Sequence, residues 1–264
     1  MIPKVIHYCW FGGNDLPDDV KKCIDSWKKF MPDYEIKRWD ETNYDINKCD
    51  YIREAYEEKK WAFVSDYARI DICYTYGGIY LDTDVEVLKS FDDLLNLDAF
   101  CGREQGKKNN DNKVNTGLVL GMKKNSLIGK IMRDDYNNKH FRDSNGKLDL
   151  TPCPVIQTNL LKKYGLNDKN VLQVVNGLTI FPTDYFCPMN QYTGKKDITD
   201  NTYSIHHYNA SWVSDVDKNR RELRKKYSKY GKLLSNVIST FVAYKNEYGI
   251  FKMWKEIIKK IGSR

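Results

Sequence analysis

The chain has 264 residues, 41% hydrophobic and 13% aromatic, which suits a large folded domain and excludes a disordered chain. Its seven scattered cysteines include no Cys-x-x-Cys pair, which argues against zinc and disulfide frameworks and favours reduced, mostly buried thiols. No signal-peptide pattern and no run of eighteen apolar residues occurs, so we expect a cytoplasmic protein, soluble or peripheral on the inner membrane face.

The net charge of +7 is unevenly distributed. Residues 218–264 carry fourteen Lys or Arg and three Glu, a balance of +11, which leaves −4 for residues 1–217. A mildly acidic body with a basic tail indicates an anionic partner that the tail alone contacts, and we expect an anionic membrane surface. A basic helix face exposed to solvent is the simpler alternative. Nucleic acid is disfavoured because no nucleic-acid-binding motif accompanies the charge.

The first predicted elements alternate between strand and helix. Residues 2–10 and 34–39 have strand patterns, and residues 18–30 between them place apolar side chains at helical spacing. This order opens many nucleotide-binding α/β folds. Helices are predicted at 51–59 and 63–76, the second ended by Gly77-Gly78 as a left-handed cap.

The later elements continue the α/β pattern and then become helical. Strands are predicted at 79–81, 114–122 and 203–208, helices at 126–138 and 154–164, and a loop at 101–115. We therefore expect an α/β domain over residues 1–217, with a central mixed sheet flanked by helices. Residues 218–264 form a basic amphipathic helical extension in this interpretation, broken near Gly249.

The clearest chemical motif is the pair Asp82 and Asp84 at the end of an apolar strand. Burying two such carboxylates is costly unless a cation pairs with them, and Mg²⁺ or Mn²⁺ favours carboxylate and phosphate oxygens. An EF-hand is excluded because neither its glycine nor its final glutamate follows. A phosphohydrolase of the HAD type also places Asp-x-Asp after a strand, although its downstream Gly-Asp motif is missing. Solvated carboxylates that cap a strand are the third alternative.

Asp66 and Arg69 form a second candidate pair, sixteen residues upstream and three apart on one helix face. An ordinary surface ion pair is the usual meaning of this spacing. The apolar neighbours Ala62, Phe63 and Ile70 favour partial burial instead. In that case Arg69 could clamp a phosphate or hydroxyl, while Asp66 binds a sugar hydroxyl.

The run Ser-Asp-x-x-Arg followed by Gly-Gly-x-Tyr-Leu-Asp-x-Asp resembles glycosyltransferase family 32. That family and its relatives include fungal mannosyltransferases, capsular polysaccharide transferases and clostridial toxin glucosyltransferase domains. The resemblance also covers the opening Ile-Pro-Lys-Val-Ile-His-Tyr-Cys-Trp-Phe-Gly-Gly, residues 34–40, and the segment from His206 to Trp212. It implies a GT-A fold and a transfer that retains the anomeric configuration.

The resemblance also implies roles for individual residues. Asp66 and Arg69 would hold the donor sugar and its phosphate side, and Asp82 would contact the ribose or a metal-bound water. Asp84 would ligate the metal directly, and we assign Asp82 to the metal site with it. Trp10 would stack on the base of the donor, and Ser211 and Trp212 would close over its diphosphate. His207 would be a metal ligand, with His206 as the alternative.

Three points stay open at the level of the residues. Asn115 could touch donor or acceptor, or could be a plain turn residue. Trp10 could belong to the core. No carboxylate stands out as a nucleophile, so Asp66, Asp111 and Asp184 remain candidates for a double displacement, which competes with attack from the face of departure.

The expected function is transfer of a hexose in surface polysaccharide synthesis. The donor would be a nucleotide sugar, a UDP-sugar rather than GDP-mannose, and the cofactor Mn²⁺ or Mg²⁺. The acceptor would be a saccharide or a lipid-linked saccharide. The alternatives are the phosphohydrolase and a non-catalytic protein that binds sugar nucleotides.

Overall fold

The computed structural model describes residues 1–106, 111–191, 194–208, 219–220, 223–224, 226–227 and 230–262. The chain divides into two compact units, Met1–Tyr208 and Asn209–Arg264, and each is described by itself. Because residues 209–218 lie outside the described part, the boundary we expect between 217 and 218 stays a proposal.

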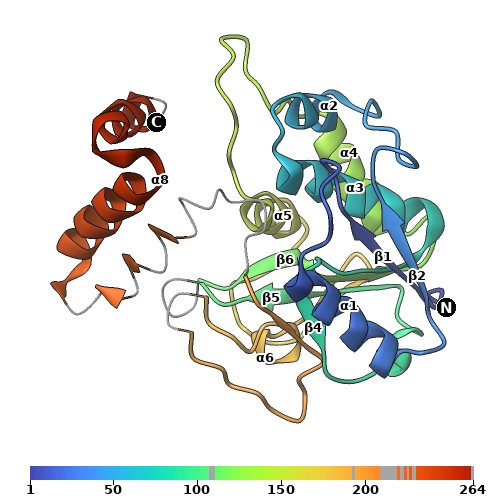
Figure 1. Ribbon diagram of the computed structural model, residues 1–264. Coiled ribbons are helices and arrows are strands. Elements are labelled where there is room, and N and C mark those ends of the chain that lie inside the picture. The colour runs from blue at the N-terminus through green and yellow to red at the C-terminus, as the bar shows by residue number, and fades with distance from the viewer. Residues whose placement is uncertain are drawn as a thin grey trace. The chain divides into compact units, whose positions relative to one another are not determined.

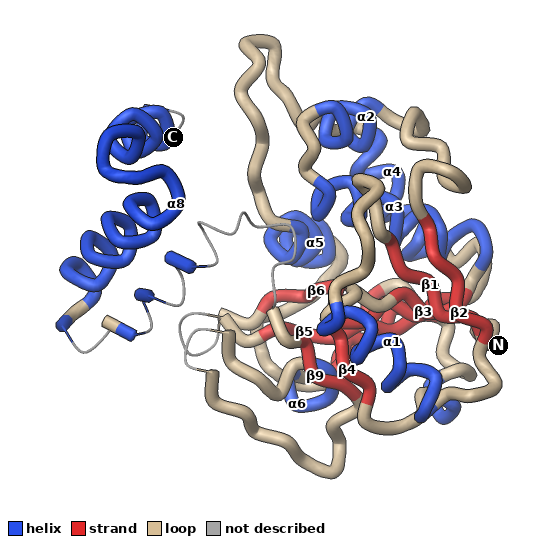
Figure 2. The backbone as a smooth tube through the Cα atoms, in the orientation of Figure 1, coloured by secondary structure: helices blue, strands red, loops and turns tan. Residues whose placement is uncertain are grey.

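The first unit is an α/β fold around a seven-stranded mixed sheet (Figures 1 and 2), which confirms the predicted fold class. The strand order is β2-β1-β3-β6-β5-β8-β7, and a separate two-stranded sheet pairs β4 with β9. The strands are β1 (Val5–Cys9), β2 (Glu35–Trp39), β3 (Gly78–Tyr80), β4 (Val85–Val87), β5 (Ala99–Glu104), β6 (Lys113–Met122), β7 (Gln173–Val175), β8 (Leu178–Phe181) and β9 (Ser204–His206). The helices of this unit are α1 (Asp18–Phe30), α2 (Asp50–Glu57), α3 (Trp61–Tyr76), α4 (Leu127–Asn137), α5 (Cys153–Lys162) and α6 (Thr183–Phe186), with a 3₁₀ turn η1 (Asp92–Leu94).

Two hydrophobic clusters cover the two faces of the sheet. One joins α2, α3, α4 and α5 to the sheet, and the other joins α1, α6 and β4, as Figure 1 shows. Successive residues of β5 illustrate the alternation: Ala99 and Cys101 belong to the first cluster and Phe100 to the second. Helices on both faces explain why residues 117–122 of the central strand β6 form a continuous apolar run.

Strand direction brings several chain segments to one edge of the sheet. β1 runs parallel to β3, β3 antiparallel to β6, and β6 antiparallel to β5, so β1, β3 and β5 point the same way. Their carboxyl ends therefore share an edge with the first residues of β6. In open α/β sheets, ligands bind outside the carboxyl ends of the strands. This edge carries Trp10, Asp82, Glu104 and Asn115.

The predicted loop at 101–115 is wrong at both of its ends. β5 extends to Glu104, β6 begins at Lys113, and the two strands pair as antiparallel neighbours with an irregularity between Cys101 and Gly102. The charged residue Arg103 looks unsuited to a core strand, yet it is fully buried. Its guanidinium donates to the carbonyls of Asn112 (3.0 Å) and Asn167 (2.7 Å). These two carbonyls accept from both terminal nitrogens of the buried guanidinium and lower the cost of its burial, while its Nε has no hydrogen-bond partner.

The Gly77-Gly78 turn depends on close packing against His7. Gly77 (φ 70°) caps α3 in the left-handed region and donates to the Cys73 carbonyl at 2.9 Å, as predicted. At Gly78 (φ 107°) a Cβ would lie 2.8 Å from His7 Nε2. His7 Nε2 donates to the Gly77 carbonyl (2.8 Å), and His7 Nδ1 accepts from Trp39 (3.1 Å), so the ring is neutral. Burial lowers the pKa of His7 to about 4.

His7 should make the protein lose stability in mild acid. The unfolded chain binds a proton at His7 below pH 6.5, and the folded chain does so only below about pH 4. The free energy of unfolding therefore decreases as the pH is lowered from 6.5 to about 4, by about 3 kcal/mol in total. Urea unfolding at pH 7 and pH 4.5 should show a smaller loss in His7→Gln, whose amide can keep one donor and one acceptor. Equal losses in the two proteins would contradict this role.

The second unit consists mainly of α8 (Lys232–Gly262), interrupted at Gly249 (φ 70°, ψ 166°), which confirms the predicted break. Ala243, Tyr244 and Met253 are buried together on it. Large apolar side chains are exposed elsewhere on this helix, at Leu234, Val237, Phe241, Tyr248 and Trp254. No helix in the described residues combines the length and the hydropathy needed to cross a bilayer.

Candidate active site and metal centre

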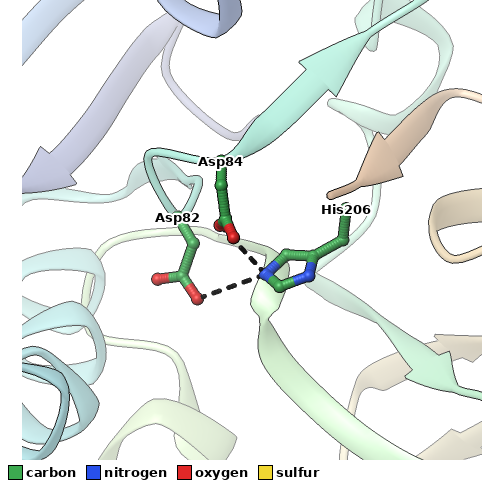
Figure 3. Close-up of side chains that lie close together, drawn as sticks. All are labelled: Asp82, Asp84 and His206. Carbon is green, nitrogen blue, oxygen red and sulfur yellow. Dashed lines mark ion pairs between the residues drawn. The ribbon is translucent and has the colours of Figure 1, made fainter. Parts of the chain in front are cut away.

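Asp82, Asp84 and His206 converge beside the carboxyl end of β3 (Figure 3). His206 Nε2 lies 3.1 Å from Asp84 Oδ1 and 3.8 Å from Asp82 Oδ2. The pairing of β4 with β9 sets this geometry, because it places Val85, the residue after Asp84, opposite His206. Trp27 of α1 donates to the Val85 carbonyl at 2.7 Å and holds β4 from the other side.

The structure corrects the histidine that we assigned to this cluster. β9 ends at His206, and the chain then turns away, with Tyr208 at φ 54°. His207 therefore points elsewhere, and its Nε2 lies 2.8 Å from Glu86 Oε2. The alternation of side chains along a strand allows only one of two adjacent histidines to face the carboxylates. His206 takes that place, which was the alternative in the sequence.

The three side chains have the chemistry of a divalent-cation site. One ligand atom from each lies within 4.8 Å of the others, and two carboxylates with one imidazole suit Mn²⁺ or Mg²⁺. Burial lowers the pKa of His206, but the Asp84 and Asp82 charges outweigh burial and raise it well above its ordinary value. A protonated imidazole thus balances the carboxylates where a metal ion can do the same. The set fits the group that the motif implies.

Arg69 links the helix α3 to the Asp-x-Asp motif. Its Nη2 lies 3.0 Å from Asp66 Oδ1 and 3.2 Å from Asp82 Oδ1, and the Arg69 side chain is 5% exposed. Tyr80 also donates to Asp82 Oδ1, at 2.9 Å. Arg69 and Tyr80 thus hold one oxygen of Asp82, and Asp82 Oδ2 is directed towards His206. The surface ion pair considered as the plain alternative is excluded by this burial.

The pair Asp66 and Arg69 is an unusually buried one. Burial raises the pKa of Asp66 to about 6, with Arg69 opposing and Asp82 adding to the rise. Burial alone would lower the pKa of Arg69, yet the charges of Asp82 and Asp66 raise it well above its usual value. A fixed cation between two carboxylates can bind a phosphate or a sugar hydroxyl without a large rearrangement.

Gly117 lets three polar side chains pack against the backbone of β6. A Cβ at this position of β6 would lie 2.1 Å from Asp82 Oδ2, 2.9 Å from Arg69 Nη1 and 3.0 Å from Asn115 Oδ1. Asp82, Arg69 and Asn115 thus come together against the backbone of Gly117, where a larger residue would displace Asp82. The Gly117 N–H donates to Asn115 Oδ1 at 2.7 Å, and Asn115 Nδ2 donates to Glu104 Oε2 at 2.8 Å. Asn115 therefore lies at the site rather than in a plain turn.

Glu104 is a site residue that the sequence analysis missed. It ends β5 at the carboxyl edge of the sheet and contacts Asn115 and, at 3.5 Å, the hydroxyl of Tyr208. Burial raises the pKa of its carboxyl group. The apolar run Ala99-Phe100-Cys101 was the available signal for the strand, but Gly102, Arg103 and the polar residues after them concealed its extent.

The remaining residues named in the sequence analysis lie in different parts of the chain. Trp10 follows β1 at the same edge, half-buried against the core, and its Nε1 donates to the Asn14 carbonyl at 2.7 Å. Asp111 pairs with Lys113, and Asp184 accepts from Asn201 at 3.0 Å, so both carboxylates are engaged away from the motif. Ser211 and Trp212 lie outside the described residues.

Comparison with known proteins supports this interpretation of the site. Residues 17–101, which include the motif, match the family described as glycosyltransferase sugar-binding region containing DXD motif. The chain is 25% identical to the uncharacterized glycosyltransferase L373 of Acanthamoeba polyphaga mimivirus, over 81% of this chain and 84% of that protein. It is 36% identical to inositol phosphoceramide mannosyltransferase 3 of Schizosaccharomyces pombe, over 39% of this chain and 30% of that protein.

A solved structure, the PaToxG glycosyltransferase, is similar at a TM-score of 0.46 and 18% identity, covering 61% of this chain and 69% of that one. Residues 17–101, which match the family, include Asp66, Arg69 and both motif carboxylates. Glu104 and His206 lie beyond this region. The sequence match and the converging motif agree on the same chemistry, and they favour it over a phosphohydrolase. The chain is a glycosyltransferase, and its residues 17–101 match the sugar-binding region that contains the DXD motif.

Proposed function

We propose that this enzyme is a metal-dependent, retaining hexosyltransferase that uses a nucleotide sugar, with UDP-sugars preferred over GDP-mannose. The observation that carries the proposal is the convergence of Asp82, Asp84 and His206 next to the buried Arg69. A divalent cation held by the first three residues supplies charge that stabilises the departing nucleoside diphosphate. Retention is what the resemblance to family 32 implies.

The chain's own groups define where the donor would lie. Arg69 presents a buried cation to the phosphate side, and Asp66 and Asn115 offer acceptors and donors for sugar hydroxyls. Gly117 lets Asp82 lie against the backbone of β6, close to Arg69 and Asn115. Trp10, at the same edge, is proposed to stack on the base, and Ser211 and Trp212 to close over the diphosphate. These roles remain part of the proposal.

A panel of nucleotide sugars with Mn²⁺, scored for slow hydrolysis of the donor, tests the proposal. We expect one UDP-sugar to be hydrolysed faster than the others, and a chelator to stop the reaction. A protein that binds a donor tightly but never turns it over, even with acceptors present, would be a sensor. Phosphate release from simple phosphate esters, without dependence on the nucleotide, would point to a phosphohydrolase.

We further propose that the acceptor is a saccharide or a lipid-linked saccharide in surface polysaccharide synthesis, reached at an anionic membrane surface. The fungal relative is named for mannosyl transfer to inositol phosphoceramide, a membrane lipid. Residues 218–264 carry +11. On α8 the exposed side chains Leu234, Val237 and Phe241 recur at three- and four-residue intervals, a spacing that suits an interfacial helix.

Flotation with liposomes tests the membrane proposal. Val237→Glu with Phe241→Glu in the full chain should reduce binding to vesicles that contain phosphatidylserine by about tenfold, because two apolar contacts are lost and two negative charges are added. The matched control is Asp18→Ala with Asp25→Ala on the exposed side of α1. Equal binding of the tail variant and the wild type would reject the proposal.

A further inference from the structure

Glu104 and Asn115 lie on neighbouring antiparallel strands at the ligand-binding edge of the sheet. The register pairs Gly102 with Asn115 and Glu104 with Lys113, so the two side chains come from residues that are close but not directly opposite. The irregularity after Cys101 shifts the end of β5 relative to β6. Such irregularities often redirect a side chain next to an active site.

The hydrogen bonds leave the Asn115 amide only one orientation. The backbone N–H of Gly117 donates at 2.7 Å, so the amide oxygen of Asn115 must face it. The amide nitrogen then faces Glu104 Oε2 at 2.8 Å, and an acceptor is required there. The amide nitrogen of Asn115 carries two hydrogens and the amide oxygen has two lone pairs. After these two hydrogen bonds, one hydrogen and one lone pair remain for a ligand.

The orientation matters because the Asn115 oxygen borders the same point as Asp82 and Arg69. That point is where a Cβ of Gly117 would lie, within 3.0 Å of Asn115 Oδ1, Asp82 Oδ2 and Arg69 Nη1, so these three polar atoms are close to one another. Such a mixture of donors and acceptors matches the hydroxyl groups of a sugar ring. A rotated amide would offer a donor where the acceptor now lies.

Glu104 also reaches the chain beyond β9. The Tyr208 hydroxyl lies 3.5 Å from Glu104 Oε2 and 3.0 Å from Cys187 Sγ, and the Tyr208 ring packs edge-on against His206 with centroids 4.2 Å apart. One carboxyl group thus contacts both Asn115 and the residue that follows the histidine pair. Its partners belong to the site rather than to the core.

We propose that Glu104 is a positioning residue, which holds the Asn115 amide in the orientation that binds the hydroxyl groups of the donor sugar. The inference rests on the proposed function. Glu104 accepts hydrogen bonds in this role and transfers no proton. An amide oxygen of the same shape can replace it, whereas an apolar side chain cannot.

The test compares Glu104→Gln, Glu104→Leu and Asn115→Ala with the wild type. The substrate is the nucleotide sugar that the wild type hydrolyses fastest, and the second probe is UDP with Mn²⁺. In Glu104→Leu we expect the KM for the nucleotide sugar to rise about tenfold, the effect of one lost hydrogen bond. The Kd for UDP should stay within about twofold of the wild-type value, since UDP lacks the hexose that is transferred. Glu104→Gln should remain close to the wild type in both measurements.

Non-additivity gives the second criterion. The double variant Glu104→Leu with Asn115→Ala should be no worse than Asn115→Ala alone, because Glu104 acts through Asn115. A Glu104→Gln protein as impaired as Glu104→Leu would overturn the inference, since charge would then be essential. So would a Glu104→Leu protein that is only less stable, with an unchanged KM. Additive effects in the double variant would overturn it too.

Another pair of variants tests the inference if Glu104→Leu does not fold. Asn115→Asp sets two carboxylates against each other, and adding Glu104→Gln restores a donor and an acceptor. We expect the double variant to have a lower KM than Asn115→Asp alone, and an equal or higher KM would overturn the inference. If the wild type turns over no nucleotide sugar, the proposed function fails, a result distinct from all of these.

Discussion

Asp84→Ala should lower turnover at least about a thousandfold while the protein remains folded. The carboxylate lies 3.1 Å from His206 Nε2 and completes the proposed cation site. Without it, two ligands remain, and the charge that stabilises the leaving group is lost, which costs about 4 kcal/mol in the barrier. Initial rates of donor hydrolysis with Mn²⁺ measure the effect. Circular dichroism and thermal unfolding establish that the variant is folded.

The adjacent histidines provide a matched pair of variants. His206→Ala should follow Asp84→Ala, with a large loss of turnover and a weaker response to added Mn²⁺. His207→Ala should keep turnover within about threefold, because its side chain contacts Glu86 rather than the motif and exposed pairs of this kind contribute little. If Asp84→Ala stays active, or if the two histidine variants exchange their effects, the site is assigned wrongly.

The contrast between these histidines shows where the sequence stops being informative. The pattern indicates that only one of them can face Asp82, but choosing between them requires the pairing of β4 with β9. That pairing joins residues 85–87 to residues 204–206, across more than a hundred positions. No local periodicity carries it. The helix α1, by contrast, was predicted with the bounds that the structure shows, because its apolar spacing is a local signal.

The difference between local and long-range signals also explains why the sequence identified Arg69 but not Glu104. Arg69 shares a helix face with Asp66, so the sequence identified the pair, and the structure added burial and the contact with Asp82. Glu104 has partners at positions 115 and 208, and neither is near enough in sequence to suggest a contact. Arg103 within the strand 99–104 also depends on a distant partner, because its Nη2 donates to the carbonyl of Asn167, sixty-four residues away. The fold class was readable from local patterns, and the complete site was not.

Gly117→Ala should reduce kcat/KM about a hundredfold with a small effect on stability. The added methyl group would lie 2.1 Å from Asp82 Oδ2, closer than any van der Waals contact allows, so the carboxylate must move. Asp82 is also held by Arg69 and Tyr80, so its displacement disturbs the orientation of the guanidinium as well. Misplacement of about 1 Å at a reacting centre can have an effect of this size. Kinetics with the preferred donor and thermal unfolding measure the two quantities.

Gly121→Ala is the matched control on the same strand. Its Cβ would lie 2.1 Å from the Phe100 ring, inside the apolar core and away from the motif carboxylates. We expect this variant to lose about 1–3 kcal/mol of stability from overpacking while the folded fraction keeps its kcat/KM. The two alanine variants thus introduce the same steric conflict in two environments. If Gly117→Ala loses only stability, the position of Asp82 does not matter for the reaction with the donor.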